Sequence, residues 1–532
     1  MESDASDSAR PQPGPRWWPA VVIVSATVAV LLVTPYLGMR FDIPSTQQTI
    51  TMLVGYGIGW ALFVIWLAAF SRFRLRTRLW ATGVFLGLCG LFWVFVKLEG
   101  LSGSMAPRFV WRFARPRQVN TSIDDLLDPV LSGVDLTSTT PHDFPQFLGP
   151  QRTPILGDVA VVRDWSQRPP RELWRREVGS GWSSFAVVGE FAVTQEQRAG
   201  QEWVVCYHVP TGAIQWIYVD DEVFVSMVAG DGPRATPTID EGRVYTLSAL
   251  GRLRCLDGAS GHLIWQYDCV DEYIAGGASM APEWGKSCSP LILGDRVLVT
   301  GGNMGPSLLA LDKHTGDIVW TAGNAGTGYS SPLVATLAGR RQIVSFNLDS
   351  VSGHAVEDGR QLWMYPWQKD RPNVAQPVPV GGSRLFISTG YGVGCALLEL
   401  QEIEGGRLRC QNVWRNRNLK AKFTNVVFAG DVIYGLDEGI LVCLDVASGK
   451  RRWKRGRYGH GQMLLLDDVL LISAEDGRLV LVEATPAEHR ELASMAALSD
   501  KTWNNPVVAG RYLLVRNHRE AACYELPLVD SD

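Results

Sequence analysis

Nine ionisable, amide or aromatic side chains stand in short segments rich in Gly, Ser and Pro that recur between residues 179 and 506. Two kinds of chemistry are to be tested there: calcium binding by carboxylate and amide oxygens, and proton abstraction by a general base. Both need carboxylates that lie together, and these segments hold no such cluster. We therefore predict no catalytic residue and no metal site. The nine candidates for a binding surface are Trp182, Arg234, Glu283, Lys286, Tyr329, Asn373, Lys422, His460 and Asn504.

Glu283 and Lys286 are the best ionisable pair among these candidates, in the longest segment, 276–290. Other motifs of enzymes are missing: the sequence has no GxxxxGK[ST] phosphate loop, no HExxH and no CxxC. Its eight His residues are scattered, and His208 and His262 are expected in or beside exposed hairpin turns. A net charge of −4 gives no overall basic field for binding a nucleic acid.

A recurrent hairpin organises the elements that would position these side chains. The sequence SLLALDKHTGDIVW, residues 307–320, has two strand-like runs around a turn in which Asp312 can cap backbone N–H groups. Gly316 supplies a left-handed backbone position, and Trp320 follows four residues later. Two clear copies carry the same residues, and weaker copies place Gly212 before Trp216 and Gly359 before Trp363. The clear copies contain Asp257, Gly261 and Trp265, and Asp445, Gly449 and Trp453.

The spacing of this hairpin predicts an all-β propeller. The first four turn glycines are 49, 55 and 43 residues apart, which is typical of four-stranded antiparallel blades. Seven repeats are followed by one of three strands, and the run 169–178, with Trp174, has the character of the missing fourth strand. Pairing it with the last three strands would close a ring of eight blades over residues 143–530. The small residues in the connections between blades then have two possible roles. They could take part in binding, or they could be needed only because the inner strands are crowded near the axis.

Three apolar runs precede the propeller: Trp17–Leu37, Ile50–Phe70 and Leu79–Lys97. Each has about the 20 residues that cross a bilayer, so we predict three transmembrane helices within a membrane anchor, 17–97. We expect a disordered cytoplasmic tail over 1–16 and a connecting region over 98–142. Part of that region, 105–117, mixes Phe109, Val110, Trp111 and Phe113 with Arg, which favours a segment lying at the membrane interface.

Arginine sets the expected orientation. The loop 71–78 holds four Arg residues, whereas the loop 38–49 holds Arg40 with Asp42. The positive-inside rule places the Arg-rich loop in the cytoplasm. The third span would then deliver the propeller to the periplasmic side of the inner, cytoplasmic membrane as part of a multi-pass protein.

The hairpin with its Asp, Thr-Gly and Trp resembles the repeat of the pyrroloquinoline-quinone (PQQ) propeller superfamily, over roughly residues 143–528. This superfamily includes PQQ-dependent alcohol and glucose dehydrogenases and the outer-membrane assembly lipoprotein BamB. The resemblance implies that an alcohol dehydrogenase would carry adjacent cysteines beneath its quinone and hold Ca²⁺ through Glu, Asn and Asp. The chain has no Cys-Cys pair.

Two hypotheses follow from this resemblance. The first is a non-catalytic, BamB-like scaffold without a cofactor, which binds envelope proteins or peptides; small-ligand sensing through the axial funnel is a variant of it. The second is a membrane-bound sugar or alcohol dehydrogenase that uses PQQ with Ca²⁺. Membrane-bound glucose dehydrogenases lack adjacent cysteines and carry N-terminal spans, but their propellers have large excursions for which this chain has little room.

The cysteines have two expected roles. Cys206, Cys255, Cys443 and, in the last repeat, Cys523 share one position of the repeat, where a small buried residue is needed and Ala310 stands in another copy. Cys269 and Cys288 flank the long connection between the second and third repeats. In an extracytoplasmic domain they could form a disulfide, and two free thiols are the alternative.

Overall fold

The computed structural model describes residues 16–41, 43–113, 133–270, 282–302 and 305–529. The chain divides into two compact units, Met1–Pro116 and Arg117–Asp532, each of which is described by itself. The predicted tail lies outside the described residues except for Arg16, and so does 114–132 of the predicted connecting region.

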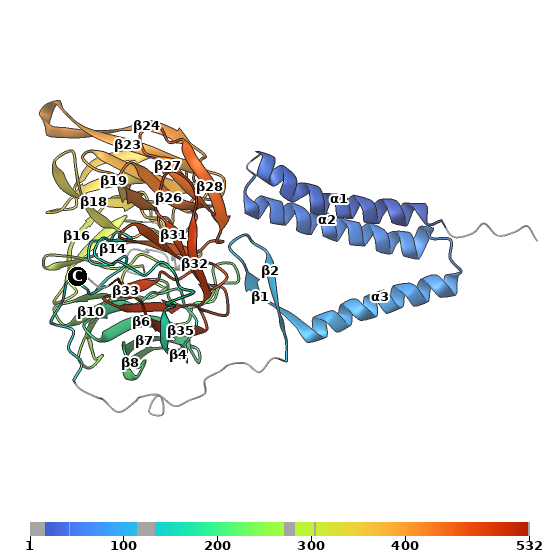
Figure 1. Ribbon diagram of the computed structural model, residues 1–532, viewed down its shortest axis with the longest axis horizontal. Coiled ribbons are helices and arrows are strands. Elements are labelled where there is room, and N and C mark those ends of the chain that lie inside the picture. Colours follow the sequence, from blue (N-terminus) through green and yellow to red (C-terminus); the bar gives the residue numbers. More distant parts are fainter. Residues whose placement is uncertain (1–15, 42, 114–132, 271–281, 303–304, 530–532) are drawn as a thin grey trace, which may run out of the picture. The chain divides into compact units, whose positions relative to one another are not determined.

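The first unit contains the three predicted helices (Figure 1): α1 (Trp18–Phe41), α2 (Ser45–Ile65), which continues as a π-helical turn (Trp66–Phe70), and α3 (Leu75–Phe95). All three are long and apolar enough to cross a membrane. Helices α1 and α2 approach closely because small residues face each other, with Gly55 against Val30 and Gly59 against Thr27.

The third helix differs in its ends from the predicted run. It begins at Leu75, within the Arg-rich loop, and ends at Phe95, so Lys97 lies in a strand. The physical reason is a hairpin that sequence periodicity did not indicate: β1 (Val96–Leu101) pairs antiparallel with β2 (Pro107–Trp111). The segment that we expected at the membrane interface therefore contributes one strand of a hairpin.

The second unit is a propeller of eight blades, as the hairpin spacing predicted (Figure 1). In each blade, four consecutive positions of the sheet form an antiparallel meander, and in most blades its first strand has only two or three residues. Blades one to four are β5 (Ala186–Val188), β6 (Phe191–Arg198), β7 (Gln201–His208), β8 (Ile214–Asp220); β9 (Thr238–Asp240), β10 (Arg243–Leu247), β11 (Arg252–Asp257), β12 (Leu263–Asp268); β13 (Leu291–Leu293), β14 (Arg296–Thr300), β15 (Leu308–Asp312), β16 (Ile318–Ala322); and β17 (Leu333–Leu337), β18 (Arg340–Phe346), β19 (Ser350–Ala355), β20 (Gln361–Pro366).

Blades five and six repeat this plan, and the last hairpin of blade five is longer, with two strands of 10 residues each. The strands are β21 (Val378–Pro379), β22 (Arg384–Thr389), β23 (Gly394–Ile403), β24 (Arg407–Asn416); and β25 (Val427–Ala429), β26 (Val432–Asp437), β27 (Ile440–Asp445), β28 (Arg451–Arg457). One turn of 3-10 helix, Glu404–Gly406, joins β23 to β24.

The last two blades close the ring. Blade seven is β29 (Gln462–Leu466), β30 (Val469–Ser473), β31 (Arg478–Glu483) and β32 (Glu491–Ala496), and blade eight begins with β33 (Val507–Ala509), β34 (Tyr512–Arg516) and β35 (Glu520–Glu525). Its fourth strand is β4 (Arg171–Glu177), with Trp174 opposite Cys523. The prediction that the run around Trp174 completes the last blade is confirmed. A fifth strand in blade seven, β3 (Ile155–Leu156), pairs parallel with β29 and is too short to show a sequence pattern.

Each repeat turn is built as its residue types indicated. The carboxylates of Asp257, Asp312 and Asp445 accept hydrogen bonds from backbone N–H groups two or three residues later, at 2.8–3.0 Å. Gly316 has φ of 81° and its N–H donates to the Asp312 carbonyl at 2.9 Å. Cys206, Cys255, Ala310, Cys443 and Cys523 are all fully buried, which confirms the small apolar position.

At five junctions between neighbouring blades, the Trp of one blade packs on the turn glycine of the next. A methyl group at Gly316 would lie 2.7 Å from the Trp265 ring, and the same close packing joins Trp174 to Gly212, Trp216 to Gly261, Trp320 to Gly359 and Trp414 to Gly449. The Trp265 indole N–H also donates to the Lys313 carbonyl at 3.1 Å. The repeat therefore contains both halves of the contact that joins one blade to the next.

A segment before the first blade enters the centre of the ring. Phe144 bridges to Val187 of β5, and the Pro145 carbonyl accepts from the Ile239 N–H of β9 at 2.8 Å. The buried Arg152 guanidinium donates to the carbonyls of Ser289 and Pro290 at 3.1 and 2.8 Å. This segment thus joins blades one, two and three near the axis.

Substitution of Gly316 tests the contact between blades. Gly316→Ala should lower the free energy of unfolding by about 1–2 kcal/mol for the left-handed backbone and by about 1–3 kcal/mol more for displacing Trp265. Gly339 is a matched control, since its φ is 73° and no atom lies within 4 Å of a Cβ there. Chemical denaturation should show the larger loss at Gly316, and equal losses would contradict a role for the Trp–Gly contact.

Candidate functional site: the aromatic end of the propeller

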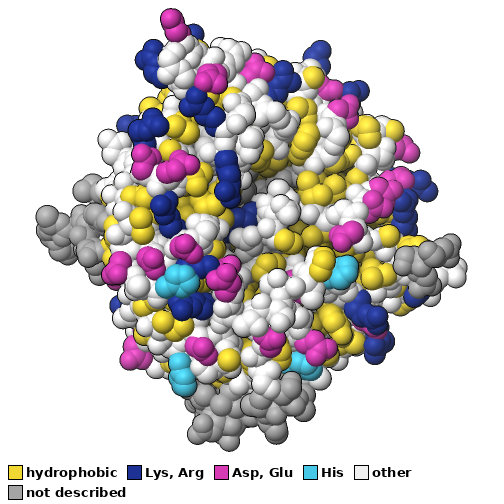
Figure 2. Space-filling view, turned by 90° about the vertical axis from the view of Figure 1, so that its left-hand side faces the viewer, with side chains coloured by type: hydrophobic (Ala, Val, Ile, Leu, Met, Phe, Trp, Pro, Cys, Tyr) yellow, Lys and Arg dark blue, Asp and Glu magenta, His cyan; other side chains and the backbone are white. Residues whose placement is uncertain are grey.

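The two ends of the propeller carry different turns because successive strands of a blade run in opposite directions. The repeat turns lie at one end. The connections between blades, and the turns between second and third strands, lie at the other. The C-terminus leaves the third strand of blade eight at the repeat-turn end, and Figure 2 views that side, where acidic, basic and apolar side chains are interspersed. All nine predicted candidates belong to the opposite end.

Small polar residues of the connections form hydrogen bonds from blade to blade around the axis. The N–H groups of Ser184, Thr236 and Ser289 donate to the hydroxyls of Thr236, Ser289 and Ser331 at 3.3, 2.9 and 2.9 Å. Amide side chains continue the pattern, with the Ser331 N–H donating to Gln376 at 3.2 Å and the Asn425 N–H to Gln462 at 3.1 Å. These hydrogen bonds hold the inner strands in place. This agrees with the structural one of the two roles that we considered for the small residues.

Six aromatic side chains, all half-buried, gather at this end; we call this set the aromatic mouth. It consists of Trp182, Trp284, Tyr329, Tyr391, Phe423 and Trp503.

The aromatic mouth has two groups. In the first, the Trp503 ring lies 4.7 Å from Trp182 and 5.0 Å from Phe423. In the second, the Trp284 ring lies 5.4 Å from Tyr329 and 6.0 Å from Tyr391. Trp284 lies in the connection before blade three, and Tyr391 lies in a turn of blade five. Their contact therefore joins two blades that are separated by blade four, which places both rings toward the axis.

Lys422 and His460 link the two groups. The Lys422 ammonium lies 5.3 Å from the centre of the Tyr391 ring and 3.4 Å from His460 Nε2, and the His460 ring lies 5.7 Å from Phe423. Both side chains are about 1% exposed. Burial lowers the pKa of His460, and the positive charge of Lys422 lowers it further. Burial also lowers the pKa of Lys422.

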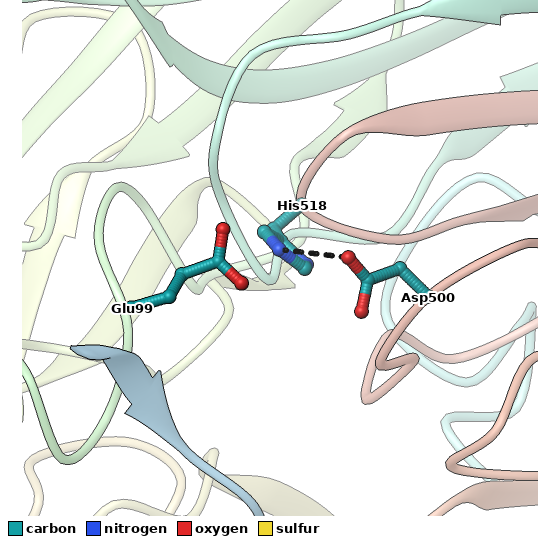
Figure 3. Close-up of side chains that lie close together, drawn as sticks. All are labelled: Glu99, Asp500 and His518. Carbon is teal, nitrogen blue, oxygen red and sulfur yellow. Dashed lines mark ion pairs between the residues drawn. The ribbon is translucent and has the colours of Figure 1, made fainter. Parts of the chain in front are cut away.

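Three carboxylates near the mouth, those of Glu438, Glu475 and Asp500, already have partners. Glu438 pairs with Lys422 at 3.5 Å. Glu475 accepts hydrogen bonds from the His460 backbone N–H at 2.9 Å and from the Trp503 indole at 3.0 Å. Asp500 pairs with His518 at 3.7 Å (Figure 3) and with Arg519 at 3.1 Å. Calcium and a general base both need carboxylate oxygens directed at the ligand, so these described residues do not fit PQQ with Ca²⁺.

Two predicted candidates, Lys286 and Asn373, bind backbone carbonyls instead of facing a ligand. The Lys286 ammonium donates to the carbonyl and hydroxyl of Thr300 at 2.7 and 2.8 Å and to the Gly301 carbonyl. The Lys286 side chain is 1% exposed, whereas Glu283 is exposed. These hydrogen bonds of Lys286 are therefore with Thr300 and Gly301 and not with Glu283, the partner that we expected. Asn373 bonds to Asn347 and Thr389 at 2.9 and 2.8 Å.

Arg234 and Asn504 also contact backbone. Arg234 donates to the Gly230 carbonyl at 2.5 Å and to the Gly232 carbonyl, and it stacks on Phe224 at 4.3 Å. Asn504 donates to the Ser183 carbonyl at 2.8 Å. Of the nine candidates, Trp182, Tyr329, Lys422 and His460 are the ones that meet at the mouth.

Five residues of this site were not predicted from the sequence: Trp284, Tyr391, Phe423, Glu438 and Trp503. Trp284, Phe423 and Trp503 stand in connections that were considered, beside residues that we chose instead. Tyr391 and Glu438 lie in turns between the second and third strands of their blades, with φ of 56° and 50°. Because strand direction alternates within a blade, these turns lie at the same end of the propeller as the connections between blades. This pattern could have identified Tyr391 and Glu438 once the blades were assigned.

Cys269 and Cys288 are separate, buried thiols that belong to one hydrophobic cluster between blades two and three. Burial raises the pKa of Cys269. The disulfide between them stays a prediction.

Comparisons with known proteins agree on the fold. Residues 201–455 match a family described as outer membrane protein assembly factor BamB. BamB from Moraxella catarrhalis superposes with a TM-score of 0.50 at 16% identity, over 68% of this chain and 99% of that one. Quinohemoprotein alcohol dehydrogenase from Comamonas testosteroni gives 0.55 at 14% identity, over 74% and 82%.

Two curated relatives are both dehydrogenases of Pseudomonas putida. Quinohemoprotein alcohol dehydrogenase ADH IIB is 28% identical over 148 residues, which cover 26% of this chain and 21% of that protein. Quinoprotein alcohol dehydrogenase PedH is 26% identical over 146 residues, which cover 25% and 23%. The chain thus spans about a fifth of the length of these relatives. The fold is that of a repeat propeller with an aromatic end, and the chain is similar to PQQ-like, BamB-like β-propeller proteins.

The lowered pKa of His460 predicts a pH dependence of stability. The folded protein keeps the imidazole neutral, whereas the unfolded chain binds a proton below the ordinary pKa of 6.5. The stability that His460 contributes is therefore present above pH 6.5 and is lost as the pH falls below it. Denaturation at pH 7.5 and 4.5 should show His460→Gln destabilised at the higher pH. The difference in the free energy of unfolding between wild type and His460→Gln should narrow by up to about 1.4 kcal/mol per pH unit below 6.5.

The control for this prediction is His262→Gln, because His262 is an exposed residue of a repeat turn. It should follow the wild type at both pH values. A constant gap between wild type and His460→Gln would contradict a neutral, buried His460.

Proposed function

We propose that this protein is a membrane-anchored, non-catalytic propeller that binds envelope proteins or peptides through its aromatic mouth. The main observation behind the proposal is that the aromatic side chains at the mouth are accessible, whereas the acidic side chains there are paired with neighbouring groups. Six aromatic rings are half-buried and accessible, while Glu438, Glu475 and Asp500 are held by neighbouring groups. Trp and Tyr dominate binding energy in protein interfaces, whereas a dehydrogenase needs carboxylates directed at its cofactor and substrate.

The three apolar helices support the anchorage, and the four Arg residues of the 71–78 loop support a periplasmic propeller. On this topology the mouth is accessible to proteins of the envelope. Because BamB is named as an outer membrane assembly factor, its likeness to this chain is consistent with a protein partner.

A PQQ-dependent dehydrogenase is the second candidate, favoured by the similarity to two alcohol dehydrogenases. Purified full-length protein mixed with PQQ and Ca²⁺ distinguishes the two functions. A quinone absorbance that stays with the protein, together with dye reduction in the presence of sugars or alcohols, would support the dehydrogenase. Neither signal is expected for a binding scaffold.

Loss of two mouth residues should weaken partner binding. Trp284→Ala with Tyr391→Ala removes rings that contact each other, and each interface aromatic of this kind contributes about 2 kcal/mol, so binding should fall at least about tenfold. The measurement is recovery of envelope proteins on the tagged full-length chain, identified and quantified by mass spectrometry. The control is Met364→Ala with Val413→Ala, which alters exposed apolar residues of outer strands. A partner lost in the control and retained in the mouth variant would refute the proposal.

The topology is tested by reporters fused after Asp532. Alkaline phosphatase, which is active outside the cytoplasm, should be active in this fusion, and β-galactosidase should be inactive. The reverse pattern would place the propeller in the cytoplasm and the Arg-rich loop outside, because the third span puts that loop and the propeller on opposite sides of the membrane.

A further inference from the structure

The chain leaves the third helix and turns at once into an aromatic hairpin. Helix α3 ends at Phe95 and β1 starts at Val96, so no linker separates the two elements. The register of the hairpin places Val96 opposite Trp111 and Leu98 opposite Phe109. Its orientation is therefore set by the end of the helix.

The aromatic residues of the hairpin pack back on the last turn of the helix. Trp111 stacks on Phe95 with 4.9 Å between ring centres and 19° between planes. Phe109 lies 5.8 Å from Phe92 and 6.1 Å from Trp93. The Arg112 side chain donates to the Trp93 carbonyl at 3.0 Å, at the helix end where a positive charge is favourable. These contacts make the hairpin a continuation of the helix surface.

That surface is apolar and open. On α3, Leu91, Phe92, Trp93 and Val94 are each about half exposed, at 46–53%; on the hairpin side Phe109, Trp111 and Phe113 are 47–61% exposed. Exposed aromatic clusters of this size mark contact with a partner or a membrane. The helix has the length and composition to cross a bilayer, so its exposed face would contact lipid. The hairpin extends that face without interruption.

The two faces of the hairpin differ in chemistry. Side chains alternate along a strand, so Phe109 and Trp111 share one face and Arg108 and Val110 share the other. Lys97, opposite Val110, adds a further cation to the second face. Aromatic rings favour the boundary between acyl chains and headgroups, and Lys and Arg favour the phosphates beside it.

The geometry assigns hairpin β1–β2 to the bilayer surface as an anchor for the end of α3. Its aromatic face contacts phospholipid at the boundary between acyl chains and headgroups, and its basic face lies toward the phosphates. The hairpin would thereby fix the depth of α3 in the bilayer and the level at which the chain leaves it. This inference rests on the proposed membrane anchorage and is independent of what the propeller binds.

Photo-crosslinking to lipid tests the assignment. The photoreactive residue p-benzoylphenylalanine replaces Trp111, Val110, Leu86 or Leu250, one at a time, in the full-length protein. Each variant is reconstituted in vesicles of phosphatidylethanolamine and phosphatidylglycerol. Leu86, on α3 and 58% exposed, reports contact with the acyl region, and Leu250, in a turn of the propeller, serves as the control outside the hairpin. Mass spectrometry of the tryptic peptides measures the yield of lipid adducts.

We expect adducts at Leu86 and Trp111, with a yield at Trp111 at least about fivefold above those at Val110 and Leu250. Adducts at Leu86 without adducts at Trp111, or equal yields at Trp111 and Val110, would overturn the anchor and leave the membrane helices intact. Failure at Leu86 as well would overturn the membrane anchorage itself.

Discussion

The contact between a tryptophan and a glycine of the next blade is the interaction on which the propeller depends. The turn glycine needs a left-handed backbone, and it also leaves the space in which the neighbouring Trp ring packs, as at Gly316 and Trp265. A side chain at the glycine would disturb both the turn and the contact. One residue thus links the local hairpin to the packing of two blades, which is why Gly and Trp recur at a fixed offset.

Ring closure follows from the same contact. Trp174 stands on a strand that precedes blade one in the sequence and completes blade eight in space, and it packs on Gly212 of blade one. Closure therefore adds one more copy of the interaction and leaves no blade with only three strands. The buried Arg516 of β34 supports the same junction through the hydroxyl of Thr194 at 2.7 Å and the carbonyl of Gly179 at 3.1 Å.

At the aromatic end, polar residues stabilise the inner strands, while aromatic side chains stay partly accessible. Ser, Thr, Asn and Gln in the connections satisfy backbone groups at the crowded axis, and Lys286 holds carbonyls of a neighbouring turn. Buried polar groups need such partners, and their side chains are then committed to the scaffold. The rings of Trp284, Tyr391 and Trp503 stay partly accessible at the end of the propeller.

The sequence by itself determined the architecture, because hairpin, turn and inter-blade contact are all written within one repeat, and because three spanning helices need only length and apolar composition. It also indicated that Trp174 belongs to the last blade. Tertiary structure alone decided which side chains meet at the mouth. Tyr391 and Trp284 are separated by more than 100 residues and by an intervening blade, and no local pattern relates them. Lys286 looked like half of an ionisable pair until its acceptors were known, since the choice between ligand and scaffold depends on which carbonyls the folded chain brings within reach.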